Sequence, residues 1–538
     1  MSKIGLLWRT IRCLTIRQIV YQIWNRFRSR PRLYLPRYVP RFYFLTAVGP
    51  CKPISWRGDT YTFLNQPVTF LNKVDWNYAD YGKLWTYNLN YFDFLNQANV
   101  TSETGLSLIR DFIGQTNQLR DGLESYPTSL RIINWAHFLS RHHVQDAQIN
   151  SHLFAQTQLL SRRLEYHLAG NHLLENGFAL LTGATYFRHK GWFQKASAIV
   201  YRELAAQILA DGCHDERSPM YHQILLDRLL DVLLILQYDP WHNDSKLTTF
   251  LTQKAACMLG WLHTITFRNG DVPMVNDSAF GVAPATFQLR KKAEQLGISS
   301  TPLFPFVAKK KDDSGYYMFR QNRYELFVDI GAVGPNHQPG HAHADTFSFL
   351  MYVDNCPVIV DSGTSTYQNG QRRQRERSTA AHNTVSIADD NSSEVWAGFR
   401  VGRRARVAVL TSTENTITAR HDGYTRSNII HERSWVVESS RLIIIDRLLS
   451  ADGKAFSAKG GIARFYFHPD VVVQVADEWV MAGPVQLSFL TETKPELCVT
   501  TYAMAEGFNQ LRSGRCIEIA FTKTLKTTLT LLNENTLP

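Results

Sequence analysis

The hydrophobic pattern of this chain changes its period once, close to residue 300. From Leu84 to about Ile298, apolar residues cluster or recur at spacings of three and four, most clearly over Leu225–Leu234, and this spacing is typical of amphipathic helices. Beyond Ser314 short apolar runs alternate with turn residues such as Asp354-Asn355, which indicates strands joined by hairpins. A chain of 538 residues is also too long for a single core. The sequence therefore predicts an α+β multidomain protein.

The two halves predict two different architectures. Helices joined by short polar breaks suit an (α/α) toroid or solenoid, although no clean sequence repeat is visible. The strand half has the turn spacing of a large antiparallel β-sandwich. A Pro- and Lys-bearing stretch at 301–314 ends the helical rhythm. We therefore divide the chain into an N-terminal arm (1–34), a toroid domain (35–305) and a β-sandwich domain (306–538).

The N-terminal arm, residues 1–34, is basic and amphipathic. It holds eight Lys or Arg residues and no acidic residue, with apolar residues between them. Arginines interrupt the apolar run that a secretory signal needs, and no stretch of the chain approaches the roughly 20 apolar residues of a membrane span. Two interpretations stay open: peripheral association with a membrane surface, or docking on the protein's own domain. We expect a cytoplasmic protein or one peripheral to the inner membrane, with the periplasm as the alternative.

The charge balance narrows the class of partner. Lys and Arg outnumber Asp and Glu by 58 to 47, a net charge of +11, and clustered positive charge favours a polyanion. The sequence contains no Lys/Arg-rich tail and no nucleic-acid-binding motif, so we expect no nucleic-acid partner. Seven widely spaced cysteines without a CxxC pair indicate reduced thiols and not a disulfide framework.

One loop contains several residues that could bind a metal or take part in catalysis. Gly334–Asp345 holds three histidines and an aspartate among Gly and Pro residues, which punctuate loops. His341 and His343 form a His-x-His pair entering a predicted strand, where alternate side chains share one side. Asp361 and His382 lie where neighbouring strands end or begin. Imidazoles and a carboxylate in this arrangement can bind a divalent metal or orient a base.

Polar clusters also mark four breaks between the predicted helices. A toroid gathers the loops of successive helix pairs at one rim, so these clusters are expected to lie close together. Helical geometry places His172 and Glu175 on one face. The residues of interest in the four clusters are Asn134, then Asn171, His172 and Glu175, then Arg217 and Tyr221, and last Asp277.

Four motifs together resemble the heparinase II/III family of polysaccharide lyases. They are Asn171-His172-xx-Glu175-Asn176-Gly177, Glu216–His222, Gly340–Asp345 and Ala381-His382-Asn383-Thr384. The resemblance covers nearly the whole chain beyond residue 80. It implies an incomplete (α/α) toroid followed by an antiparallel β-sandwich, with an active site between them. It also implies cleavage of uronic-acid glycosides by elimination.

The resemblance implies a role for each of these residues. Asn171 and His172 would stabilise the uronate carboxylate as an enolate develops, while Tyr221 and His341 would move protons. Arg217 is the candidate cation for lowering the pKa of the Tyr221 phenol. The predicted substrate contacts are Glu175, Arg217, Asn134 and Asp277. The implied metal ligands are His343, Asp361 and His382, which suit Zn²⁺ in a mainly structural site.

Two alternatives come from other functional classes. Toroids also host glycoside hydrolases, which need two carboxylates flanking the sugar, for instance Glu175 with Asp277. A catalytically idle polysaccharide-binding protein is the other, although both Tyr221 and His341 are present. The basic arm resembles that of accessory proteins of bacterial exopolysaccharide or capsule production. We therefore predict an acidic polysaccharide as the substrate.

Overall fold

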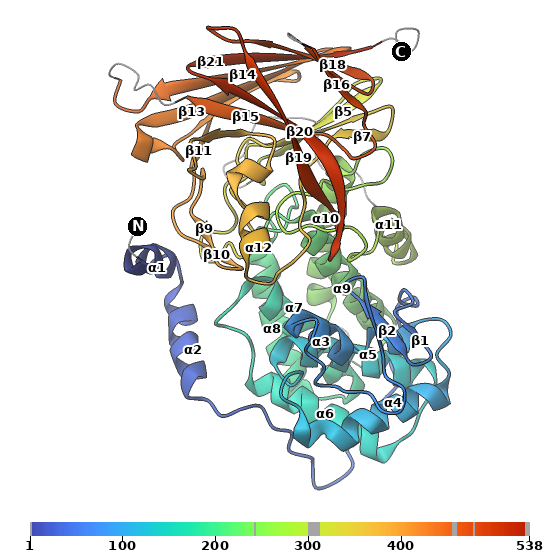
Figure 1. Cartoon of the computed structure of the whole chain (residues 1–538). Helices are drawn as coiled ribbons and strands as arrows, with labels where there is room; N and C mark the ends of the chain where they lie inside the picture. Colours follow the sequence, from blue (N-terminus) through green and yellow to red (C-terminus); the bar gives the residue numbers. More distant parts are fainter. Residues whose placement is uncertain (1–2, 242–243, 300–312, 454–459, 477–478, 533–538) are drawn as a thin grey trace.

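The computed structural model describes residues 3–241, 244–299, 313–453, 460–476 and 479–532. Helices form one body and sheets the other, while the N-terminal arm lies along their side (Figure 1). This arrangement confirms the predicted α+β class, with a toroid followed by antiparallel sheets. The predicted domain boundary at residues 305 and 306 lies outside the described residues.

The helical body is built around two helices that are buried along nearly their whole length. Every residue of 127–140 in α5 and of 173–186 in α7 is buried, as expected for helices that are surrounded by others. The sequence also determines where some helices begin. At the N-caps of α6 and α10, the side chains of Asp146 and Asp244 each accept a hydrogen bond from a backbone N–H of the first turn. The helices of this body are α3 (Lys83–Tyr91), α4 (Ser102–Gln115), α5 (Ser125–Arg141), α6 (Ala147–Arg162), α7 (Gly170–Tyr186), α8 (Lys190–Gln207), α9 (Pro219–Tyr238), α10 (Ser245–Ile265) and α11 (Thr286–Gln295).

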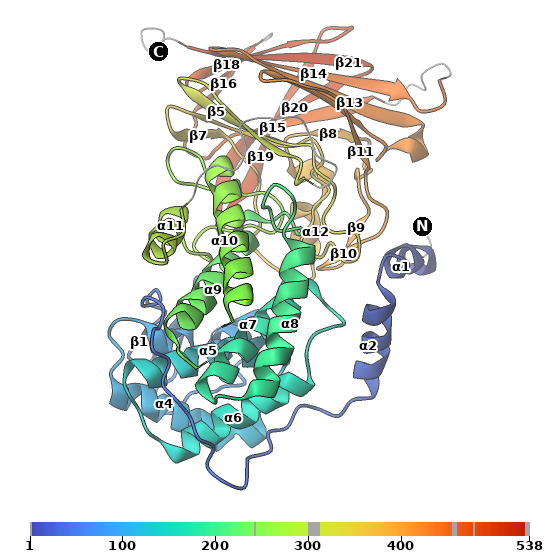
Figure 2. The same cartoon turned by 180° about the vertical axis from the view of Figure 1, so that it is seen from behind.

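Among the described residues, the strand body contains three antiparallel sheets of four or more strands around one main core, together with one two-stranded sheet (Figure 2). An eight-stranded sheet has the order β11 (Val407–Ser412), β12 (Thr416–His421), β13 (Ile429–Val437), β14 (Arg441–Ser450), β21 (Thr524–Leu531), β18 (Val485–Leu490), β17 (Trp479–Ala482) and β16 (Val473–Val475). A four-stranded sheet has the order β19 (Glu496–Gly507), β20 (Gln510–Phe521), β15 (Gly461–Tyr466) and β8 (Val385–Ile387). Another has β4 (Tyr316–Arg320), β5 (Tyr324–Asp329), β6 (Phe349–Val353) and β7 (Cys356–Ile359). Short elements β9 (Val395–Trp396), β10 (Arg400–Val401) and α12 (Gln371–Glu376) lie on the side facing the helices.

The hairpins follow the turn chemistry of the sequence. Asp354 and Asn355 adopt φ values of 50° and 64° between β6 and β7, which matches a two-residue turn of the type that suits strand twist. Ser439 and Ser440 form the turn of another hairpin, because Val437 pairs with Leu442 in the β13–β14 ladder.

Two features near the N-terminus were not predicted from the sequence. A small sheet of β1 (Trp56–Arg57), β2 (Thr60–Phe63) and β3 (Gln66–Thr69) precedes the helices. It contacts the β19–β20 hairpin of the strand body, because Asn65 Nδ2 donates to Phe508 O and Asn509 Nδ2 donates to Leu64 O. The arm forms two helices, α1 (Lys3–Ile11) and α2 (Ile16–Phe27). Among the described residues, no helix is both long and apolar enough to cross a membrane.

A buried ion pair lies in the core of the strand body. Arg433 on β13 and Asp446 on β14 are direct cross-strand partners, neither is exposed, and Arg433 Nε donates to Asp446 Oδ1 at 2.6 Å. Arg433 also donates to the carbonyls of Phe347 and Asn383, both at 2.8 Å. The pair therefore supports the two loops that carry the histidines of the predicted site.

Replacing Asp446 with Asn should destabilise the protein by about 3–5 kcal/mol, because it leaves the Arg433 charge buried and uncompensated. The free energy of unfolding, measured by urea denaturation, tests this. Glu432→Gln is the matched control, since Glu432 pairs with the half-exposed Arg447 on the same two strands and such pairs contribute at most about 1 kcal/mol. Equal losses of stability in the two variants would show that the buried pair contributes no more than the half-exposed one.

Candidate active site

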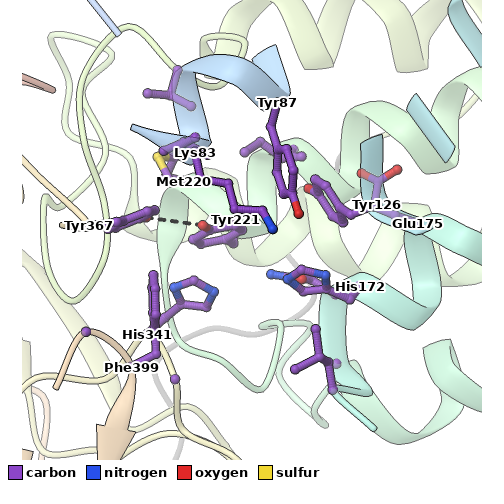
Figure 3. Close-up of a pocket in the computed structure, with 18 of the residues that line it drawn as sticks. Lys83, Tyr87, Tyr126, His172, Glu175, Met220, Tyr221, His341, Tyr367 and Phe399 are labelled. Atoms are coloured by element: carbon purple, nitrogen blue, oxygen red, sulfur yellow. Dashed lines mark hydrogen bonds between the residues drawn. The ribbon is translucent and has the colours of Figure 1, made fainter. Parts of the chain in front are cut away.

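A cavity of about 780 Å³ lies between the helical and strand bodies. Its helical wall comes from α3, α5, α7 and α9, and its other wall comes from segments at 337–341, 366–368, 397–400 and 508–509. Figure 3 shows side chains from both walls pointing toward one another. Tyr87, Tyr91, Tyr126, Tyr367, Phe399 and Phe508 give the cavity many aromatic surfaces. Aromatic walls with a few convergent polar groups are typical of a ligand site.

Tyr221 enters the cavity from the first turn of α9. Ser218 caps this helix by accepting the N–H of Tyr221, and Pro219 occupies the first turn, a pairing that favours a helix start. The Tyr221 hydroxyl lies 3.1 Å from that of Tyr367, and its ring centroid lies 4.0 Å from that of His341 (Figure 3). Burial, with the nearby Tyr367, raises the pKa of Tyr221 well above its ordinary value. The phenol is therefore protonated and suited to donate a proton.

His341 is oriented by a fully buried carboxylate. Its Nδ1 lies 2.8 Å from Asp277 Oδ2, and Arg373 contacts both oxygens of that carboxylate at 2.5 and 2.7 Å. Burial alone would raise the pKa of Asp277, but Arg373 holds it well below its ordinary range. An ionised carboxylate only accepts hydrogen bonds, so Nδ1 of His341 carries the proton. The other nitrogen, Nε2, lies 3.7 Å from Glu216 Oε2, and in a neutral imidazole it would hold the lone pair and act as the base.

Asn171 and Glu216 meet at the start of α7. Asn171 donates through its backbone N–H and its Nδ2 to the Glu216 carboxylate, at 3.2 and 3.0 Å. Gly170 has a φ of 53°, and a Cβ there would meet Glu216 Oε1 at 2.5 Å. Glycine is therefore required both by the conformation and by the close approach of the carboxylate. The second N–H of the Asn171 amide is left for a ligand.

His172 and Glu175 add two titratable groups to the same wall. Burial would lower the pKa of His172, but the carboxylate of Glu165, 3.3 Å from its Nδ1, raises it. Burial raises the pKa of Glu175 to about 7, and neither of its oxygens has a hydrogen-bond partner. The wall therefore offers an imidazole whose charged form is favoured by Glu165 and a carboxyl group that is largely protonated below neutral pH.

Two family models match this sequence. The model described as heparinase II/III N-terminus matches residues 125–294, and the one described as heparinase II/III-like, C-terminal matches residues 306–528. The chain belongs to the heparinase II/III-like family. This confirms the resemblance inferred from the four motifs, all of which lie inside the matched ranges.

Individual relatives are distant. The chain is 22% identical over 404 residues to a heparin-sulfate lyase of Pedobacter heparinus, covering 69% of this chain and 56% of that protein. It is 21% identical over 335 residues to a heparin-sulfate lyase of Bacteroides stercoris, covering 56% of this chain and 46% of that protein. The chain thus spans about half the length of the curated relatives that it matches.

Solved structures of the heparinases share the fold. A crystal structure of heparinase III superposes with a TM-score of 0.69 at 16% identity, covering 87% of this chain and 81% of that one. A heparan sulfate lyase from Pedobacter heparinus gives a TM-score of 0.57 at 15% identity, covering 88% and 80%. At these identities the likeness concerns the arrangement of toroid and sheets.

Within this family fold, three predicted substrate contacts lie outside the cavity. Arg217 donates to the carbonyls of Ser314 and Gly334 at 3.1 and 2.9 Å. It therefore joins the two bodies and is not the cation beside Tyr221 that the sequence suggested. Asn134 is buried and donates to the carbonyl of Tyr91, so its amide is used in packing α5 against α3.

Asp277 is the third residue that does not line the cavity. Its side chain is 0% exposed, and its oxygens are shared by Arg373, His341 and His343. A carboxylate enclosed in this way cannot contact a sugar in the cavity. The hydrolase alternative that paired it with Glu175 therefore loses one of its two carboxylates.

The predicted metal ligands lie directly behind His341. His343 and His382 are fully buried, and their ring centroids are 5.4 Å apart. His343 Nδ1 and His382 Nε2 are buried without a hydrogen-bond partner. Asp361 instead contacts Nδ1 of His382 at 2.7 Å and accepts the N–H of Gly363. In the described ranges, no three His, Cys, Asp or Glu side chains converge as a metal site.

Three residues of the site were missed by sequence reasoning. Glu216 belongs to a motif that we identified, but no role was assigned to it. Tyr367 and Arg373 lie in the segment between Asp361 and His382, where no motif marks them. Their importance depends on partners distant in the chain, since Arg373 is 96 residues from Asp277.

Glu175→Gln should change how stability depends on pH. The folded-state pKa of Glu175 is raised from 4.5 to about 7, so its contribution is present at low pH and is lost as pH rises through this range. The amide of Gln does not ionise, so the variant does not lose this stability as pH rises. The variant should therefore gain stability relative to wild type between pH 5 and 8, by about 3 kcal/mol in full.

Urea unfolding of both proteins at several pH values measures this difference. Glu103→Gln, an exposed site on α4, is the control and should show no such trend. A difference between Glu175→Gln and wild type that stays constant from pH 5 to 8 would show that Glu175 is not titrating there.

Proposed function

We propose that this protein is a polysaccharide lyase that cleaves a uronic-acid-containing acidic polysaccharide by β-elimination. The observation that carries the proposal is the contact of Tyr221 with His341, with ring centroids 4.0 Å apart inside the cavity. One residue comes from the helical body and the other from the strand body. They provide an acid and a base side by side, next to residues that can bind a carboxylate. The heparin-sulfate lyases to which the chain is similar support the same reaction class.

Elimination requires two proton transfers. A base removes the proton from C5 of the uronate, and the electrons of that bond form the C4–C5 double bond. The bond from C4 to the glycosidic oxygen breaks, and the departing oxygen takes a proton from an acid. His341 is the base, because its Nδ1 proton is held by Asp277 and the proton acceptor is then Nε2, which lies 3.7 Å from Glu216 Oε2. Tyr221 is the acid, because its raised pKa keeps the hydroxyl protonated.

The C5 proton is acidic enough only when the uronate carboxylate is stabilised as the enolate develops. Asn171 has a second amide N–H beyond the one that binds Glu216, the raised pKa of His172 favours its charged form, and Glu175 is partly protonated at neutral pH. All three line the cavity. Donors positioned where charge develops lower the barrier more than they strengthen ground-state binding.

We also place the protein in bacterial exopolysaccharide or capsule metabolism. Its net charge of +11 favours an acidic polymer as the substrate. The basic arm, residues 1–34, has many exposed residues on the surface of the protein. A screen of uronic-acid polymers by the ultraviolet absorbance of the unsaturated product tests both class and substrate. A hydrolase would release sugar ends without this absorbance, because hydrolysis forms no double bond.

Tyr221→Phe should lower turnover by about 10²–10⁴, the usual contribution of a general acid, while leaving the fold intact because only a hydroxyl is removed. Product absorbance measures turnover, and the melting temperature checks the fold. Tyr201→Phe, an exposed tyrosine on α8, is the control and should keep full activity. Full activity in Tyr221→Phe would remove the tyrosine from the mechanism.

We further propose that Zn²⁺ binds between His343 and His382 and braces the strand-side wall. The support is the pair of buried ring nitrogens without partners, a fit for imidazole ligands. Burial lowers the pKa of His343 to about 4, so this ring is neutral and able to coordinate. Asp361 orients His382 through its other nitrogen, as carboxylates often do beside metal-binding histidines. When bound, the ion would supply rigidity behind His341.

Purified protein should contain about one tightly held zinc ion per chain, and His382→Ala should lose it. Because an ion that binds only the native state stabilises it, this variant should also melt at a lower temperature. Elemental analysis and thermal unfolding measure the two effects. His341→Ala is the control: it should keep the metal while losing activity. Metal-free wild-type protein would contradict the proposal.

A further inference from the structure

The two helices of the arm are attached to the protein through their polar faces. Gln18 on α2 is 1% exposed, and its Nε2 donates to Leu168 O at 3.3 Å and to Gln338 Oε1 at 3.2 Å. On α1, Arg9 donates to Glu394 at 2.7 Å and Thr10 accepts from Trp396 Nε1 at 3.1 Å. Tyr21 and Arg17 also contact the ring of Tyr166, at 4.8 and 3.7 Å from its centroid. The contacts of the arm with both bodies are therefore mainly hydrogen bonds, an ion pair and contacts to an aromatic ring.

The apolar faces of the same helices point away from the protein. Ile4 and Trp8 on α1 are 80% and 66% exposed, and Ile16, Ile23, Trp24 and Phe27 on α2 are 54–85% exposed. With Val20, which is 55% exposed, the residues at 16, 20, 23, 24 and 27 lie on one side of α2, and those at 4 and 8 lie on one side of α1. Figures 1 and 2 show both helices at the outer edge of the molecule.

This orientation is the reverse of that of a helix which merely docks on its own domain. Such a helix buries its apolar side and leaves the polar side in water. Large exposed apolar patches on a folded protein mark a surface that another body covers. The sequence left two interpretations of the arm open, and the contacts of Gln18 and Thr10 favour the interpretation with an outside partner.

The chemistry of the arm identifies that partner as an anionic surface. Residues 1–34 hold eight basic and no acidic residues, and Arg12, Arg26 and Arg30 are exposed near the apolar faces. Trp8 and Trp24 on the outer side have the amphipathic rings that favour a membrane–water interface. A second copy of the arm would bring positive charges together, which is unfavourable.

We propose that the arm binds the surface of an anionic lipid bilayer, with the apolar faces of α1 and α2 in the headgroup region and the arginines on lipid phosphates. The protein is then peripheral, held by residues 3–32. Leu168 and Gln338, which accept from Gln18, also line the cavity. Binding through the arm therefore places one end of the cavity near the membrane. This inference is independent of the proposed lyase activity.

Co-sedimentation of the full-length protein with lipid vesicles tests the proposal. The protein should bind mixed phosphatidylglycerol–phosphatidylcholine vesicles, release them as salt is raised, and bind pure phosphatidylcholine at least about tenfold more weakly. The double variant Trp8→Ser/Trp24→Ser should lose at least about tenfold in partitioning. Arg12→Gln/Arg26→Gln should lose a similar factor on anionic vesicles only.

Phe287→Ser is the matched control, because Phe287 on α11 is 70% exposed but lies outside the arm, and it should bind as wild type does. All variants should keep the wild-type melting temperature. The proposal is overturned if the protein binds neither vesicle, or if the tryptophan variant binds as tightly as wild type. It is also overturned if lipid-free sedimentation shows a dimer that only the tryptophan variant dissociates, since a second copy would then cover the apolar faces.

Discussion

The carboxylate of Asp277 fixes the geometry on which the site depends. It lies in the segment that follows α10, yet its partners Arg373, His341 and His343 all belong to the strand half. Removing an ionised carboxylate from water costs several kcal/mol, and this cost is offset only when its charged and hydrogen-bonding partners are all in place. Asp277 therefore holds the two bodies in one relative position, and the same bonds orient the imidazole in the cavity and the imidazole behind it.

Features with local causes could be predicted from the sequence. The change of hydrophobic period predicted the two bodies, and Asp354-Asn355 predicted its hairpin, since turn residues encode their own conformation. Asn171, His172, Glu175, Tyr221 and His341 were singled out by their motifs, and the structure brings all five to one cavity. Their chemical roles stay predictions, because the cavity shows proximity and protonation and not turnover.

Features that depend on distant partners could not be predicted. Asp277 was expected to contact substrate because it lies in one of the polar loops that a toroid gathers at one rim. No residue near it in the sequence indicates that Arg373 is its partner. Arg217 was expected beside Tyr221 because the two residues lie in the same loop. Its guanidinium instead donates across the domain junction to the carbonyl of Gly334. The sequence also could not predict which face of the arm helices is turned toward the protein. A helical pattern shows which residues share a face, and only packing shows which face is turned inward.

The two residues of the acid–base pair belong to different hydrophobic cores, and this affects how the protein loses activity on heating. Tyr221 stands on the helical core and His341 on a loop of the strand core, so a slight relative rotation would separate them while each core stays folded. Turnover then reports on the junction, whereas calorimetry reports on the cores. Heating should inactivate such a molecule before it unfolds, and the inactivated form should regain function when the two bodies settle back together on cooling.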